Sequence, residues 1–269
     1  MSWSENIFHT KKPIIGLLHL LSLPGDPFYG GSMEEVVRRA KEDLVSLQDG
    51  GVDGFLITNE FSMPYSQKAG VLTCAAMTRV FGEIAHLIRV PFGIEAIHDG
   101  PSCMKLCAVT GASFTRCLFT GAWSSDLGLH VHDIAETLRV RHELRLDHLN
   151  LCYFINGEGS TCLDTRSLAD KAKSMLFQCR PEAFVVAGSM AGHEPDTRQI
   201  STVKEISGDR APVLCGTGFN YDNSEAILSV ADGAFVGSAI KKDSIFTNPI
   251  DQARVERLME KVRAYREGL

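Results

Sequence analysis

The chain has 269 residues, of which 44% are hydrophobic and 22% charged, a balance typical of a globular protein with a large core. The formal net charge of −6 excludes a bulk attraction to nucleic acid or to an anionic membrane surface. No apolar run reaches the roughly 18 residues that span a bilayer, and the N-terminal MSWSENIFHTKKP lacks the apolar core of a signal peptide. We therefore expect a cytoplasmic protein with no integral membrane segment and no nucleic-acid partner.

Short apolar runs recur along the chain with helical patterns between them, as expected of parallel strands under crossover helices. Their ranges are 14–18, 54–58, 92–96, 114–118, 148–152, 183–187, 212–215 and 233–236. This succession predicts a single (β/α)8 TIM barrel, one domain spanning residues 1–269. An open doubly wound sheet is the alternative.

Polar capping residues mark several helix starts. Ser32 and Glu35 form a capping box, and Asp251 precedes the last helical pattern. Pro101, which follows Asp99 and Gly100, suits the first turn of a helix. These signals place helices between the predicted strands and support the barrel.

Two strands end in turns of small residues. The run 212–215 leads into Gly216, Thr217 and Gly218, and the run 233–236 leads into Gly237 and Ser238. Such turns leave backbone N–H groups free to bind an anion. TIM barrels bind phosphate at the ends of their last two strands, so these five residues are the predicted phosphate-binding site on the C-terminal face.

Ionisable residues near the ends of earlier strands are candidates for acid–base catalysis, which needs groups able to give or take a proton at the reacting atom. The predicted catalytic residues are His19, Glu60, Glu95 and Asp99. We expect no cofactor. A divalent metal held by His19, Glu95, His98 and Asp99 is the alternative, because imidazole with carboxylate suits zinc or manganese.

Four further residues are expected to orient the substrate. They are Asn59, Arg116, Gly188 and Ser189. Arg116 is the only arginine inside a predicted strand, and Glu95 on the neighbouring strand is its obvious partner. The pair is either architectural or part of a site in which Arg116 binds a carboxylate or phosphate.

The chain resembles the BtpA/SgcQ family along nearly its whole length. The stretches that carry the resemblance include IIGLLHLLSLPGDPFYGGSMEEVVRRA, GGVDGFLITNEF, TGASFTRCLFTGAWSSDLG, PVLCGTGF and ADGAFVGSAIKKDS. The resemblance implies a phosphate-binding (β/α)8 barrel, whose members are described as photosystem I biogenesis factors or as proteins encoded beside sugar-uptake genes. The family pattern carries over to His19, Asn59, Asp99, Arg116, Gly121, Asp126, Gly188, Gly216, Gly218, Gly237 and Ser238.

Departures from the family pattern concentrate opposite the predicted phosphate site. Glu95 and Leu118 stand where typical members carry asparagine, and the polar run after the fifth strand is replaced by 153–156. We expect an enzyme acting on a small phosphorylated metabolite, phosphosugar-like, by isomerase, epimerase or lyase chemistry. The alternative is a non-catalytic binding or complex-biogenesis factor that keeps the phosphate pocket. A homo-oligomer is compatible with either function.

Overall fold

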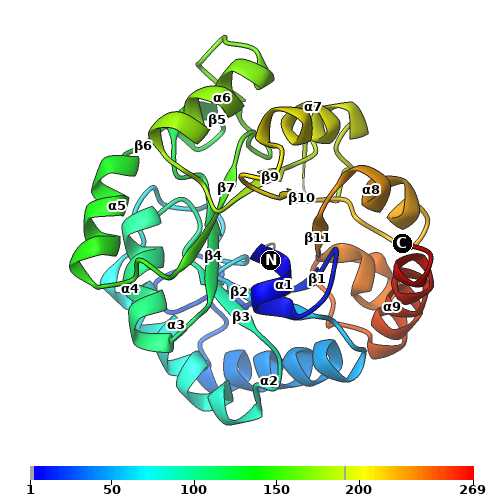
Figure 1. The fold of residues 1–269 in the computed structure, drawn as a ribbon. Coiled ribbons are helices and arrows are strands. Elements are labelled where there is room, and N and C mark those ends of the chain that lie inside the picture. Colours follow the sequence, from blue (N-terminus) through cyan, green and yellow to red (C-terminus); the bar gives the residue numbers. More distant parts are fainter. Residues whose placement is uncertain (1–2, 191) are drawn as a thin grey trace.

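The computed structural model describes residues 3–190 and 192–269, and its central feature is a closed barrel of eight parallel strands (Figure 1). Around the barrel the order is β1-β11-β10-β9-β7-β4-β3-β2. These strands are β1 (Ile14–His19), β2 (Gly54–Thr58), β3 (Phe92–Glu95), β4 (Phe114–Cys117), β7 (Asn150–Phe154), β9 (Ala183–Val186), β10 (Val213–Cys215) and β11 (Gly233–Val236). The predicted TIM barrel is confirmed, with the fifth barrel strand shifted two residues toward the C-terminus.

Helices surround the barrel and cover its outer face (Figure 1). They are α2 (Met33–Asp49), α3 (Val71–Ile84), α4 (Gly100–Thr110), α5 (Ile134–Glu143), α6 (Leu168–Gln178), α7 (Thr197–Ser207), α8 (Ser224–Val230) and α9 (Gln252–Glu267), with short 3-10 turns η1 (Ala85–Leu87), η2 (Ser238–Ile240) and η3 (Lys242–Ser244). Ser32, Asp99 and Asp251 cap α2, α4 and α9 with their side chains, as predicted. Among the described residues, no helix combines the length and apolarity needed to cross a membrane.

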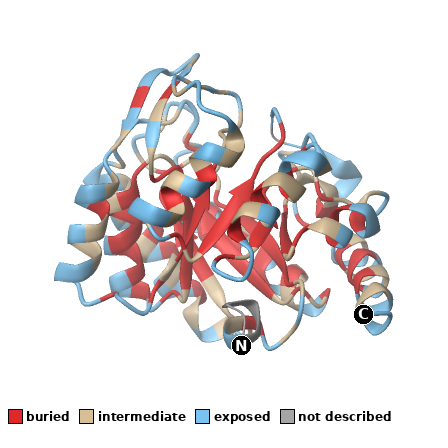
Figure 2. Cartoon of the chain, turned by 45° about the horizontal axis from the view of Figure 1, so that its top comes forward, coloured by how far each residue is buried: buried red, intermediate tan, exposed pale blue. Residues whose placement is uncertain are grey.

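The strand side chains divide into two buried layers because successive residues point to opposite faces. Ile14 and Leu18 of β1 pack outward against the helices, whereas Ile15 and Leu17 fill the barrel interior. Figure 2 shows the strands buried and the outer helix faces exposed. Because the interior is a packed core, ligand chemistry is confined to the strand ends and their loops.

A short N-terminal helix, α1 (Trp3–Phe8), lies across one end of the barrel (Figure 1). Phe8 is buried and meets Phe114 edge to face, with ring centroids 5.6 Å apart. Gly54 leaves room for it, since a Cβ there would stand 2.4 Å from the Phe8 ring. These contacts lie at the first residues of β2 and β4, so α1 closes the end opposite the functional loops.

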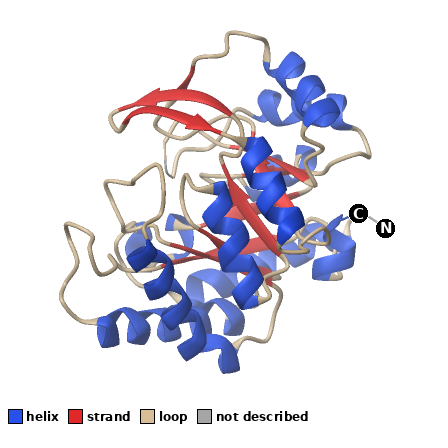
Figure 3. Cartoon of the chain, turned by 90° about the vertical axis from the view of Figure 1, so that its left-hand side faces the viewer, coloured by secondary structure: helices blue, strands red, loops and turns tan. Residues whose placement is uncertain are grey.

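A second, three-stranded sheet stands outside the barrel and was not predicted. The strands β5 (Gly121–Ser125) and β6 (Gly128–His132) form an antiparallel hairpin after β4, and β8 (Thr161–Cys162) pairs with β5. Figure 3 shows the hairpin projecting above the barrel. The sheet thus joins the loop after β4 to the loop after β7.

Candidate functional site

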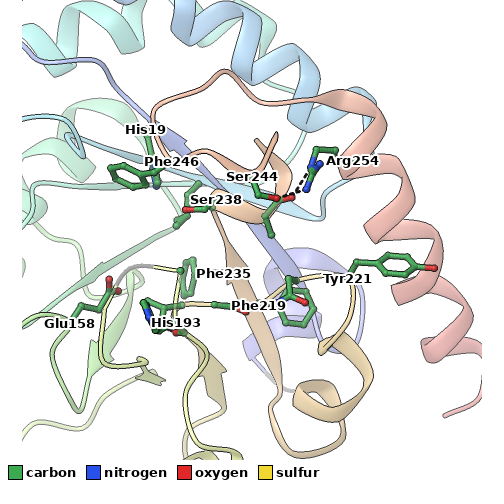
Figure 4. A pocket seen from close by; sticks show the side chains of 18 of the residues that line it. His19, Glu158, His193, Phe219, Tyr221, Phe235, Ser238, Ser244, Phe246 and Arg254 are labelled. Carbon is green, nitrogen blue, oxygen red and sulfur yellow. Dashed lines mark hydrogen bonds between the residues drawn. The ribbon is translucent and has the colours of Figure 1, made fainter. Parts of the chain in front are cut away.

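A cavity of about 610 Å³ opens at the C-terminal ends of the barrel strands. Residues of β1, β4 and β11 line it, together with residues that follow β2, β7, β9, β10 and β11 and two arginines of α9. In Figure 4, Glu158 and His193 lie across the cavity from His19 and Phe246. The candidate site is therefore assembled from segments far apart in the sequence.

Backbone amides dominate the side of the cavity formed after β10 and β11. The N–H groups of Gly218, Phe219, Gly237 and Ser238 make no hydrogen bond within the described part of the chain. The N–H of Gly216, in contrast, donates to the Val186 carbonyl at 2.8 Å. Unpartnered amides at two neighbouring strand ends suit an anion.

Two of these glycines are required by the local geometry. Gly218 has a φ of +67°, and a Cβ there would stand 2.2 Å from the backbone nitrogen of Glu194. A Cβ on Gly237 would approach Cε1 of His19 to 3.3 Å. Glycine therefore permits the turn at residue 218 and leaves the His19 ring uncovered at residue 237.

Thr217 has a structural role in this wall. Its hydroxyl accepts from the Gly188 N–H at 2.6 Å and donates to the His193 carbonyl at 3.0 Å. The turn after β10 is thereby tied to the loop after β9. Thr217 lines the cavity, but its hydroxyl is already engaged.

Two arginines of α9 add positive charge beside the amides, and the sequence analysis missed both. Arg254 donates to the Ala239 carbonyl at 3.1 Å and also to the Ser244 hydroxyl (Figure 4). Arg257 stacks on Tyr221, its guanidinium carbon 4.1 Å from the ring centroid. Their spacing of three residues puts both on one helix face, the signal that could have identified them.

Arg116 and Glu95 form a buried ion pair inside the barrel mouth. Both Nε and Nη2 of Arg116 donate to Oε2 of Glu95, at 3.2 and 3.0 Å. The guanidinium is sandwiched between Phe154 and Phe235, 4.9 and 4.7 Å from the ring centroids. Burial raises the pKa of Glu95 to about 7, although the Arg116 charge opposes the shift. Among the described residues Nη1 of Arg116 is buried without a partner, so its N–H groups remain for a ligand.

Glu60, after β2, and Glu158, after β7, supply carboxyl groups to the cavity. Glu60 Oε2 lies 3.1 Å from the Thr58 hydroxyl, and the side chain is 16% exposed. Burial raises the pKa of Glu158 to about 8, and the nearby carboxylates of Glu60 and Glu95 contribute. Glu158 is thus protonated at neutral pH. Sequence reasoning missed it because it follows β7 by four residues.

His19 ends β1 and contacts a lysine that was not among the predicted site residues. Nζ of Lys241 lies 3.0 Å from Nδ1 of His19. Burial, assisted by the Lys241 charge, holds the pKa of His19 well below its usual range. Burial also lowers the pKa of Lys241 to about 8. His19 is therefore a neutral imidazole beside a buried cation.

Five predicted site residues do not line this cavity, and one of them is Glu95, which lies behind Arg116. Asp99 caps α4, accepting from Ser102, and its Oδ2 also accepts from the Ala69 N–H at 2.8 Å. Asn59 accepts from the Ile97 N–H at 2.9 Å and borders a different hollow. Gly188 and Ser189 border a further hollow beside Trp123. The structure thus gives Asp99 and Asn59 loop-ordering contacts. Of the predicted catalytic residues, His19 and Glu60 line the cavity, and Glu95 contacts the lining residue Arg116.

The predicted alternative was a divalent metal site, and the described residues hold no side-chain cluster that matches it. Across residues 3–190 and 192–269, no three or more His, Cys, Asp and Glu side chains are arranged to hold a metal ion. His98 instead lies in a group of imidazoles, its ring centroid 4.8 Å from that of His130 and 6.0 Å from that of His132.

Known proteins similar to this chain share its full length. The sgc region protein SgcQ of Escherichia coli K12 is 39% identical over 268 residues, covering 99% of this chain and 100% of that protein. The photosystem I biogenesis protein BtpA of Synechocystis sp. is 29% identical over 265 residues, covering 97% and 91%.

The fold is also found in solved enzymes of low sequence similarity. Phosphoribosyl anthranilate isomerase from Thermus thermophilus superimposes with a TM-score of 0.55 at 9% identity, covering 94% of this chain and all of that one. Such a likeness concerns the barrel alone. The BtpA family profile, in contrast, matches residues 10–264. The chain belongs to the BtpA family.

Proposed function

We propose that this protein is an enzyme that acts on a small phosphorylated metabolite, with a phosphosugar as the substrate class. The proposal rests on one observation, the distribution of polar groups around the cavity. Unpartnered amides near Gly218 and Gly237, with Arg254, line one side, and proton-transferring side chains line the other. A volume of about 610 Å³ accommodates a small metabolite.

The phosphate is proposed to bind between the turns after β10 and β11. Gly218, Phe219, Gly237 and Ser238 would donate backbone N–H groups, and Arg254 would supply charge. This arrangement would hold the rest of the ligand toward β2, β4 and β7. Anchoring one end in this way orients the reacting atoms.

The chemistry proposed is proton transfer, as in an isomerase, epimerase or lyase. Glu60 would act as the base and the protonated Glu158 as the acid, since both line the cavity and burial raises the pKa of Glu158. The free Nη1 of Arg116 and the imidazole of His19 would stabilise negative charge that develops on a carbonyl or hydroxyl oxygen. Glu95 would keep Arg116 in place.

The first test is ligand-induced stabilisation in an unfolding assay. Phosphorylated sugars, each paired with the same sugar lacking phosphate, are tested with and without divalent metals. A ligand present at 100 times its Kd should raise the free energy of unfolding by about 2.7 kcal/mol. The unphosphorylated partner should give no stabilisation. If no phosphorylated compound stabilises the protein, the proposed site is wrong.

The second test separates catalysis from binding. Ligands found in the first test are incubated in D₂O, and exchange of a carbon-bound proton is followed by NMR. Glu60→Gln and Glu158→Gln should bind the ligand but lose exchange, whereas the exposed Glu143→Gln should keep it.

A non-catalytic binding or biogenesis factor is the second candidate function. It is favoured by the similarity to a photosystem I biogenesis protein. It predicts ligand stabilisation with no exchange in the wild-type protein.

A further inference from the structure

Lys241 is the buried charge that the proposed function leaves unused. It follows η2 and is 1% exposed. Its Nζ donates to the Phe246 carbonyl at 2.5 Å and lies 4.9 and 5.0 Å from the ring centroids of Phe61 and Phe246. The amine does not line the cavity, so it contacts a ligand only through what it does to its neighbours.

The remaining polar neighbour of Lys241 is His19. An ammonium group donates hydrogen bonds and accepts none. Nδ1 of His19, 3.0 Å from Nζ, must therefore present a lone pair. A neutral imidazole carries its single proton on the other nitrogen in that case, so the proton lies on Nε2.

Nε2 of His19 faces the cavity side of the ring. It is buried and has no hydrogen-bond partner in the described part of the chain. A Cβ on Gly237 would stand 3.6 Å from it, which places it against the turn after β11. Glu60 Oε2 is the acidic atom that faces it, at 3.8 Å. The Nε2–H group is thus a donor without an acceptor until a ligand arrives.

We infer that Lys241 is a positioning residue that fixes His19 as the neutral Nε2–H tautomer, which makes His19 a hydrogen-bond donor to the ligand and not a base. The ligand role rests on the proposed function, but the tautomer is a property of the free protein. In that role His19 would polarise a ligand oxygen near Glu60, and proton abstraction would be left to Glu60.

The test is ¹⁵N NMR of the histidine ring nitrogens in ligand-free protein. In the wild type, His19 should show a protonated Nε2 and an unprotonated Nδ1 from pH 5 to pH 7.5. In Lys241→Met the Nδ1–H tautomer should appear. The pKa of His19 should also rise, because one cation is lost while Glu60 remains and Arg116 and Arg39 still oppose protonation.

Lys242→Met is the matched control, since Lys242 is the adjacent residue and is exposed. It should leave the His19 signals unchanged. A protonated Nδ1 in the wild type, or an unchanged tautomer in Lys241→Met, would overturn the inference. His19→Leu identifies the His19 signals by their disappearance.

A second measurement applies if Lys241→Met does not fold. The pKa of Lys241 is lowered to about 8, and the neutral amine formed above that pH can accept a hydrogen bond from an Nδ1–H group. Any Nδ1–H tautomer of the wild type should therefore appear only between pH 8 and pH 10. A wild type in which the Nδ1–H tautomer already predominates below pH 8 would contradict the inference. Neither measurement involves a phosphorylated ligand, so this failure is separate from failure of the proposed function.

Discussion

The two walls of the cavity are built from different chemical groups. After β10 and β11 the candidate anion site consists of backbone amides, and its position depends on glycines such as Gly218. The facing wall consists of ionisable side chains, with Glu95 and Arg116 buried together and Glu158 close by. Backbone donors keep their polarity at every pH, whereas buried carboxyl groups change charge with pH and with their neighbours. The proposed anion binding and the proposed proton transfer therefore depend on different groups, so a change to one wall can leave the other wall unchanged.

The largest effect is expected from breaking the buried ion pair. Arg116→Met leaves Glu95 buried without its cation, so the free energy of unfolding should fall by about 3 kcal/mol. Urea unfolding measures the loss. Adding Glu95→Gln should restore part of the stability, because the uncompensated carboxyl group is removed.

The control for this prediction is Arg38→Met. Arg38 pairs with Glu35 and Glu42 on the exposed face of α2, where its side chain is 54% exposed. Its removal should cost much less stability than the removal of Arg116, because solvent screens an exposed pair. Equal costs at Arg38 and Arg116 would remove the distinction between a buried and a solvated pair.

The second prediction concerns the pH dependence of stability. The pKa of Glu158 is raised to about 8 in the folded protein, so the folded state holds a proton that the unfolded state releases above its ordinary pKa near 4.5. Stability should therefore be highest below pH 4.5 as far as this group is concerned, and should decrease as the pH rises toward 8. Glu158→Gln should remove this decrease and be more stable than wild type at pH 8, by on the order of 2 kcal/mol.

Urea unfolding at pH 5 and pH 8 checks this prediction. Glu143→Gln, on the exposed face of α5, is the control and should follow the wild-type pH dependence. A wild type that becomes more stable from pH 5 to pH 8, with Glu158→Gln showing the same gain, would contradict it.

The third prediction tests the backbone wall. Gly218→Ala forces a side chain into a position with positive φ and close to Glu194, so it should cost about 2 kcal/mol of stability and at least tenfold in phosphate affinity. Gly111→Ala is the matched control. Gly111 has a φ of +72° at the end of α4 with no atom within 4 Å of its Cβ, so it reports the backbone strain alone. Phosphate affinity unchanged in Gly218→Ala would place the anion elsewhere.

The smallest effect is expected at Ser238. Its side chain lines the cavity (Figure 4). Ser238→Ala should weaken phosphate binding by about 1 kcal/mol, because it removes one hydrogen bond. Isothermal titration with inorganic phosphate measures it. The exposed Ser229→Ala should bind as the wild type does.

The barrel was predictable from the sequence because its strands are short, apolar runs that are buried on both faces. The hairpin of β5 and β6 was not, since its strands are only partly buried and the sequence of β5, Gly-Ala-Trp-Ser-Ser, lacks a regular apolar alternation. Its pairing depends on β8, a two-residue strand nearly 40 positions from the start of β5. No local pattern signals such a contact.

The candidate site was predictable only in part, for a related reason. His19, Glu60 and Arg116 lie in or beside strands, so their proximity follows from the closed barrel. The contact of Lys241 with His19 was not predicted, because its burial depends on the return of the chain to Phe246. Asp99 is a predicted catalytic residue whose side chain caps α4, a role that the Asp-Gly-Pro pattern signals.

The outer sheet carries a consequence for how this barrel can diversify. The loop bearing Glu158 runs from β7 to β8, and β8 is held by Trp123 and Ser124 of β5. The hairpin inserted after β4 thus helps to set the position of Glu158 after β7. The turns at Gly218 and Gly237 do not depend on this hairpin. Grafting a different hairpin between β4 and α5 would therefore be a compact way to redirect substrate choice while retaining the anchor for a shared chemical group.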